Sequence, residues 1–177
     1  MPSGFLANCV GYSSAAFRAV GLAGIRTVVT VSSLQLGVGP TTVNTKPLLA
    51  LDDVKRIAAA AEAEALRNAW AVSIAIVDDG GHLLWLQRQD GAAPVSSHIA
   101  PAKARTAALG RRESRVYEEM INQGRTSFLS VPALEGMLEG GVPIVVEGHC
   151  VGAVGVSGVK SIEDAQIAKA GIAALGF

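Results

Sequence analysis

Two pairs of short apolar runs, each joined by a tight turn, constrain the fold of this chain most strongly. In the first pair, the runs over 72–76 and 82–86 flank the turn 78–81, which reads Asp-Asp-Gly-Gly. In the second pair, the runs over 142–146 and 150–156 flank a Glu-Gly dipeptide. Connections this short join antiparallel strands, whereas parallel strands need a long crossover. The sequence therefore predicts two β-hairpins and disfavours a doubly wound parallel sheet.

Helical periodicity surrounds the two hairpins. Apolar residues recur at three- and four-residue spacing over 52–68, and similar patterns predict helices over 102–109, 114–122 and 161–175. Serines and a proline before residue 102 leave the first residue of the second helix open. The order helix, hairpin, helices, hairpin, helix predicts an α+β fold, in which helices flank an antiparallel sheet.

The chain carries more apolar material than a small monomer usually needs. Half of its 177 residues are hydrophobic and 17% are charged, and its mean hydropathy is +0.38. This length is typical of one domain with one core. We therefore expect some of the apolar surface to face another subunit, in a homo-oligomer.

Charge and cysteine content argue against several classes of function. Fifteen Lys and Arg balance fifteen Asp and Glu, and aromatic residues make up 5% of the chain. A nucleic-acid binder normally needs a positive field and stacking platforms, so we expect no nucleic-acid partner. Cys9 and Cys150 have neither metal-ligand spacing nor a disulfide pattern, and we interpret both as free thiols.

Residues 1–46 differ in composition from the remainder. They include Arg18, Arg26 and Lys46 but no acidic residue, a bias shared with targeting segments. However, no basic cluster opens the chain and Arg26 interrupts the main apolar stretch, so neither a signal peptide nor a membrane span fits. We expect a flexible or partner-bound arm before a domain over 47–177, and a cytoplasmic location, with export as the alternative.

Five short motifs in the second part of the chain resemble one known family. They are VDDGGHLL at 77–84, DGA at 90–92, KARTA at 103–107, GGVPI at 140–144 and GAVGVSG at 152–158. Together they resemble the GlcG/HbpS family, which includes the C-terminal domain of PduO-type corrinoid proteins. The resemblance implies a profilin-like α+β fold, a homo-oligomer that is often an octamer, and haem or a corrinoid as the ligand of several members. It implies no single reaction.

The glycines of the last motif invite comparison with phosphate-binding loops. Gly152, Gly155 and Gly158 lie within and just after a predicted hairpin strand, and their spacing differs from G-x-G-x-x-G. We interpret them as positions of close packing, because glycine in a strand often permits another backbone to approach.

Histidines and cations near the second helix are the best candidates for ligand binding. His98 lies at the entrance of this helix, shortly before Lys103 and Arg105. Neutral imidazole is a common ligand of haem iron, while cationic side chains bind carboxylates and haem propionates. We therefore predict that His98, Lys103 and Arg105 position an anionic small molecule, with His98 as the candidate haem ligand. His82 and His149 flank turns and are interpreted as surface or edge residues.

The candidates for acid–base chemistry have less support from the sequence than those for ligand binding. Tyr117, Glu147 and Asp90 could transfer protons if they were buried, because desolvation raises the pKa of a carboxyl and a tyrosine can donate a proton. Cys150 follows His149, but adjacent strand residues point to opposite faces, so we interpret Cys150 as structural.

Two functions follow from these patterns. The first is a binding protein for a small ligand of the haem or corrinoid type. The alternative is a cofactor-independent lyase or isomerase that acts on a small organic acid, which could be aromatic, in a catabolic pathway. A purely structural oligomer is a third interpretation. Whether the chain is an enzyme is left open by the sequence.

Overall fold

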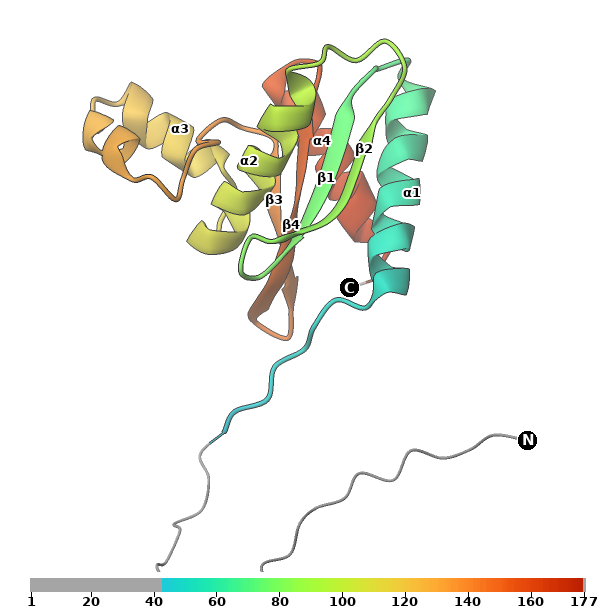
Figure 1. The fold of residues 1–177 in the computed structure, drawn as a ribbon, viewed down its shortest axis with the longest axis horizontal. Helices are drawn as coiled ribbons and strands as arrows, with labels where there is room; N and C mark the ends of the chain where they lie inside the picture. The colour runs from blue at the N-terminus through green and yellow to red at the C-terminus, as the bar shows by residue number, and fades with distance from the viewer. Residues whose placement is uncertain (1–42, 177) are drawn as a thin grey trace, which may run out of the picture. The chain divides into compact units, whose positions relative to one another are not determined.

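The computed structural model describes residues 43–176 (Figure 1). The predictions for residues 1–42, including Cys9, lie outside the described residues. The elements in chain order are α1 (Leu51–Arg67), β1 (Ser73–Asp78), β2 (Leu83–Arg88), α2 (Ser96–Gly110), α3 (Arg115–Asn122), the 3₁₀ helix η1 (Thr126–Ser130), β3 (Gly141–Val146), β4 (His149–Ser157) and α4 (Ser161–Ala173).

The four strands form one antiparallel sheet in the order β2-β1-β4-β3. The two predicted hairpins are present, and their inner strands β1 and β4 pair with each other in the centre. The predicted α+β class, with an antiparallel sheet flanked by helices, is therefore confirmed. The edge strands are β2 and β3.

Helices cover both faces of the sheet. On one face, α1 packs against β1 and β2 and α4 packs against β4 and β3, and Ile74 and Ile76 of β1 belong to the core cluster on this face. On the other, α2 lies along β4 and β1 (Figure 1). There, Ala104 and Ala107 pack against Val77. The α1 stripe that the sequence predicted is buried and consists of Val54, Ile57, Ala58, Ala61 and Ala65.

Two glycines of β4 lie very close to neighbouring backbone, Gly155 to α2 and Gly152 to β1. A Cβ on Gly155 would lie 2.1 Å from the carbonyl oxygen of Ala100 and 2.5 Å from the backbone nitrogen of Ala104. A Cβ on Gly152 would lie 2.4 Å from the carbonyl oxygen of Val77. These distances are below van der Waals contact, so the interpretation of these two glycines as close-packing positions is confirmed.

Helix α2 begins at Ser96, six residues before the predicted 102, and contains Pro101. Proline removes one helical hydrogen bond, which is why the pattern did not predict a helix through this position. Packing compensates for the loss, because Ala100 and Ala104 are fully buried against the sheet. Within residues 43–176, no helix combines the length and apolar character that crossing a membrane requires.

Candidate functional site

A groove between the β1–β2 turn and α2 brings several chemically active side chains together. Its volume is about 400 Å³, within the usual range for small-molecule sites. The residues that line it are Val77, Gly81, His82, Leu83, His98, Pro101, Ala102, Arg105 and Glu135. We call this feature the turn–helix groove. It contains two of the predicted ligand-binding residues, His98 and Arg105, and adds His82 and Glu135.

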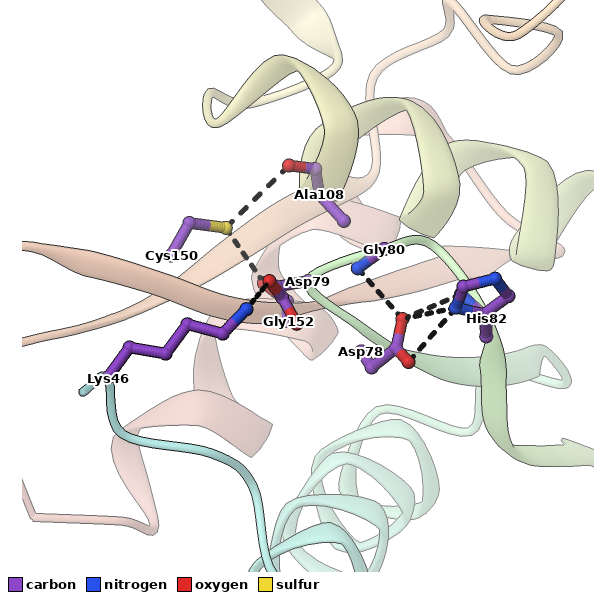
Figure 2. A network of polar contacts seen from close by, with 8 residues as sticks. All are labelled: Lys46, Asp78, Asp79, Gly80, His82, Ala108, Cys150 and Gly152. Carbon is purple, nitrogen blue, oxygen red and sulfur yellow. Dashed lines mark hydrogen bonds and ion pairs between the residues drawn. The ribbon is translucent and has the colours of Figure 1, made fainter. Parts of the chain in front are cut away.

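The β1–β2 turn forms one wall of the groove and is organised by Asp78. One carboxylate oxygen, Oδ1, accepts hydrogen bonds from the backbone N–H groups of Gly80, at 2.9 Å, and His82, at 2.8 Å. The other oxygen, Oδ2, lies 3.1 Å from Nδ1 of the His82 ring (Figure 2). Asp78 therefore holds both the turn and the imidazole in place.

Hydrogen bonding determines the ionisation of Asp78. Partial burial by itself would raise the pKa of Asp78, but hydrogen bonds from the backbone and ring of His82 and from Gly80 lower it below its ordinary value. The carboxylate is thus charged near neutral pH and favours a proton on Nδ1 of His82. In the neutral ring, this arrangement leaves the lone pair of Nε2 available to a ligand.

Helix α2 forms the opposite wall with one exposed stripe. His98 and Arg105 are seven residues apart, which is close to two helical turns, so their side chains share a face. Both are exposed. Gly81 brings the turn against this stripe, since a Cβ there would lie 2.9 Å from Cγ of Arg105. The groove is therefore bordered by the guanidinium of Arg105 and the imidazoles of His82 and His98. Its apolar wall consists of Val77, Leu83, Pro101 and Ala102.

Lys103, the third predicted ligand-binding residue, lies elsewhere. Its side chain is buried, with the residue 3% exposed. Its Nζ lies 2.8 Å from Oδ2 of Asp164 in α4 and donates to the carbonyl oxygen of Val156 at 3.0 Å. Two residues correspond to about 200° around a helix, so Lys103 and Arg105 face opposite sides. The prediction that Lys103 lines the pocket is corrected: this lysine belongs to the core.

The ion pair of Lys103 and Asp164 is buried on both sides. Desolvation raises the pKa of Asp164, and the neighbouring Lys103 ammonium partly offsets that effect. The backbone N–H of Val159 donates to the second carboxylate oxygen at 3.3 Å. The pair therefore joins α2, the end of β4 and the start of α4.

The three acid–base candidates do not line the turn–helix groove. Tyr117 is buried in α3, where its ring meets Phe128 edge to face with centroids 5.4 Å apart. Glu147 is exposed in the β3–β4 turn at φ 50°. Asp90 is exposed beyond the end of β2 and borders a separate hollow beside Trp70. No acid–base role follows from these positions.

A further hollow lies beside Cys150 and is lined by Asp79 of the same turn. An ion pair between Lys46 and Asp79 borders it (Figure 2). Arg111 and His149 also line this hollow. Burial raises the pKa of the Cys150 thiol, which keeps it protonated and supports its structural interpretation. Within residues 43–176, no group of three or more His, Cys, Asp or Glu side chains is arranged to hold a metal ion.

Sequence comparison places the chain among known proteins. The family described as "Haem degrading protein HbpS-like" matches residues 49–173. Protein GlcG of Escherichia coli strain K12 is 57% identical over 113 residues, which are 64% of this chain and 84% of GlcG.

Structural comparison agrees with the sequence. A double mutant of Streptomyces reticuli HbpS superposes with a TM-score of 0.71 at 32% identity, covering 76% of this chain and 92% of that protein. The PduOC protein in a haem complex superposes with a TM-score of 0.65 at 28% identity, covering 72% of this chain and 95% of that one. Together with the antiparallel sheet and its flanking helices, these matches show that the chain belongs to the HbpS-like family.

Proposed function

We propose that this protein binds a small organic anion in the turn–helix groove. The observation that carries the proposal is the meeting of Arg105 with two imidazoles, of His82 and His98, beside the apolar wall of one groove. A guanidinium binds a carboxylate through two parallel hydrogen bonds, and apolar walls hold the carbon skeleton.

Haem, or a related corrinoid, is the first candidate for this ligand. The description of the family and the haem complex of a structural relative both support it. The donor set of the groove fits haem, because His98 offers a neutral imidazole to the iron and Arg105 a cation to a propionate. When bound, haem supplies a redox-active iron, and the residues of this chain orient it and neutralise its carboxylate.

We further propose that the protein acts as a homo-oligomer, with an octamer as the size that the family resemblance implies. Support comes from the large apolar side chains that this fold leaves exposed. On β2 alone, Leu83 is 51%, Leu84 41% and Leu86 42% exposed. Neighbouring exposed leucines of this kind often mark an interface.

A lyase or isomerase that acts on a small organic acid without a cofactor is the alternative function. The specific observation in its favour is the pairing of Asp78 with His82. A carboxylate that orients one imidazole nitrogen leaves the other to accept or return a proton. Arg105 on the opposite wall would hold the carboxylate of the substrate within reach of that nitrogen.

Titration with hemin separates these functions. We expect a saturable, shifted Soret band with the wild-type protein, and an affinity at least about tenfold lower for Arg105→Ala, because a charged hydrogen bond is lost. His98→Ala should remove the spectrum of an imidazole-ligated iron. Arg56→Ala, an exposed arginine on α1, and His149→Ala are matched controls that should behave like wild type.

Other outcomes are equally informative. If no Soret shift develops, the haem proposal is wrong, and binding of small carboxylates that depends on Arg105 would favour the enzyme. If Arg105→Ala and His98→Ala bind hemin like wild type, the ligand lies outside the turn–helix groove.

A further inference from the structure

The hollow beside Trp70 opens between the end of α1 and the end of β2, and it shares no lining residue with the turn–helix groove. Its volume is about 490 Å³, within the range of small-molecule sites. Leu66 and Trp70 line it on the side of α1, and Gln87, Gln89 and Asp90 line it on the side of β2. We call this feature the Trp70 hollow.

Strand alternation places two glutamines on the α1 side of the sheet. Gln87 pairs with Ile74, which belongs to the core cluster beneath α1 and α4, and opposite residues in an antiparallel pair share a face. Gln89 lies two residues later and therefore shares this face. Nε2 of Gln87 donates to Oε1 of Glu62 in α1 at 2.6 Å, as this placement requires.

The side-chain amide of Gln89 has one buried group without a partner. Its Oε1 accepts a hydrogen bond from the backbone N–H of Val72 at 3.1 Å, which orients the amide. Nε2 is buried and has no hydrogen-bond partner within residues 43–176. A buried donor without an acceptor costs free energy. Because Gln89 lines the Trp70 hollow, a bound molecule with an acceptor atom would satisfy this donor.

Three charged residues also border the hollow. Glu62 is partly buried, whereas Arg88 and Asp90 are exposed. None of the three forms an ion pair with another side chain in the part of the chain that the structure describes. Two unpaired carboxylates attract an ammonium group, while a guanidinium attracts a carboxylate. The hollow therefore suits a ligand that carries both charges.

Apolar surface completes the hollow. Leu66 is 66% exposed on α1 and lines it. Trp70 follows the helix directly, held by a hydrogen bond from its backbone N–H to the carbonyl oxygen of Ala65 at 3.0 Å, and its ring is partly buried. An exposed leucine beside an indole ring is a suitable surface for an apolar or aromatic side chain.

We propose that the Trp70 hollow binds a free α-amino acid with an apolar side chain. The carboxylate of this ligand accepts a hydrogen bond from Nε2 of Gln89, next to the positive charge of Arg88. Its ammonium group pairs with the two carboxylates, and its side chain packs against Leu66 and the indole ring. This site is separate from the turn–helix groove and does not rest on the proposed function.

Simpler ligands match only part of this set. A carboxylic acid without an amine could pair with Gln89 but would leave Glu62 and Asp90 without a cation and would be repelled by them. An amine without a carboxylate would leave Nε2 of Gln89 buried without an acceptor. A zwitterion satisfies both requirements at once.

Calorimetric titration of the full chain with related probes tests the inference. L-phenylalanine carries both charged groups, 3-phenylpropionate lacks the ammonium and 2-phenylethylamine lacks the carboxylate. We expect saturable binding of L-phenylalanine, and affinities at least about tenfold lower for the two truncated probes, because each loses a charged hydrogen bond. L-leucine, which keeps both charges and an apolar side chain, should also bind.

Two isosteric variants separate the two ends of the ligand. Glu62→Gln keeps Oε1 as the acceptor for Gln87, and Gln89→Glu keeps an acceptor for the N–H of Val72. Glu62→Gln should weaken L-phenylalanine and 2-phenylethylamine about tenfold without weakening 3-phenylpropionate. Gln89→Glu, measured at about pH 8 to keep the new carboxyl ionised, should weaken L-phenylalanine and 3-phenylpropionate without weakening the amine.

Controls and failures are equally specific. Glu147→Gln and Gln123→Glu make the same changes at exposed positions outside the hollow and should bind every probe like wild type. If neither L-phenylalanine nor L-leucine binds, or if Glu62→Gln and Gln89→Glu bind L-phenylalanine like wild type, the inference is wrong. Equal affinity for L-phenylalanine and a truncated probe would also overturn the amino acid as ligand. Hemin titration of both variants should match wild type, so this inference and the proposed function fail independently.

Discussion

Replacing Asp164 by alanine should lower the free energy of unfolding by about 3–5 kcal/mol, the usual cost of leaving one member of a buried ion pair alone. The substitution leaves the Lys103 ammonium in the core with one carbonyl acceptor, that of Val156. The N–H of Val159 also loses its acceptor. Equilibrium unfolding in urea, followed by circular dichroism, measures the change.

The double variant Lys103→Met and Asp164→Leu is the matched control. It removes both charges and keeps comparable volume, so it should recover most of the lost stability, as apolar replacements of buried ion pairs often do. If Asp164→Ala unfolds at the same urea concentration as wild type, the pair does not contribute to the core. Lys103→Ala should act in the same way as Asp164→Ala, through stability and not through a direct ligand contact.

Gly155→Ala should be nearly as destabilising, by about 3 kcal/mol. The added methyl group would lie 2.1 Å from the carbonyl oxygen of Ala100, so α2 must move away from β4. Backbone atoms cannot yield as a flexible side chain can. Thermal or urea unfolding of the variant measures the cost.

Gly124→Ala is a control that separates the cost of a steric clash from the cost of a left-handed backbone conformation. No atom lies within 4 Å of the added Cβ, but the residue has φ +97°. This control carries the cost of a left-handed backbone, about 1–2 kcal/mol, without any clash. If Gly155→Ala costs no more than Gly124→Ala, the approach of α2 to β4 is looser than the structure indicates.

The hairpins could be predicted from the sequence because their signals are local. A turn such as 78–81 and the apolar runs beside it lie within about fifteen residues, and turn chemistry fixes the connection. The start of α2 was harder to predict, because Pro101 opposes the helix locally while burial of Ala100 against β4 favours it. Tertiary packing outweighs the local preference there.

The candidate site was predicted in part. His98 and Arg105 line one groove, but grouping them with Lys103 ignored the helical period, which places Lys103 and Arg105 on opposite faces. The role of His98 and Arg105 in ligand binding stays a prediction. The partner of Lys103 is Asp164, sixty-one residues later, which no local pattern indicates.

His82 was predicted to be a surface or edge residue, and its side chain is 80% exposed. Its place beside α2 was not predicted, because the turn gives no sign of what it packs against. The contact between Gly81 and Arg105 places this turn beside α2. The four-residue spacing of Asp78 and His82 across two glycines is the signal that could have identified the pair.

Nuclear magnetic resonance of the three histidine rings tests the central claim most directly. The chain has three histidines. His82 and His98 line the turn–helix groove, whereas His149 lines the hollow beside Cys150. Gallium protoporphyrin IX, a diamagnetic analogue of haem, and benzoate, a small carboxylate, would each be titrated into the labelled protein. We expect the ring signals of His82 and His98 to shift with at least one of these probes while those of His149 stay in place. A shift of His149 alone, or no shift with either probe, would contradict the assignment of the groove as the binding site.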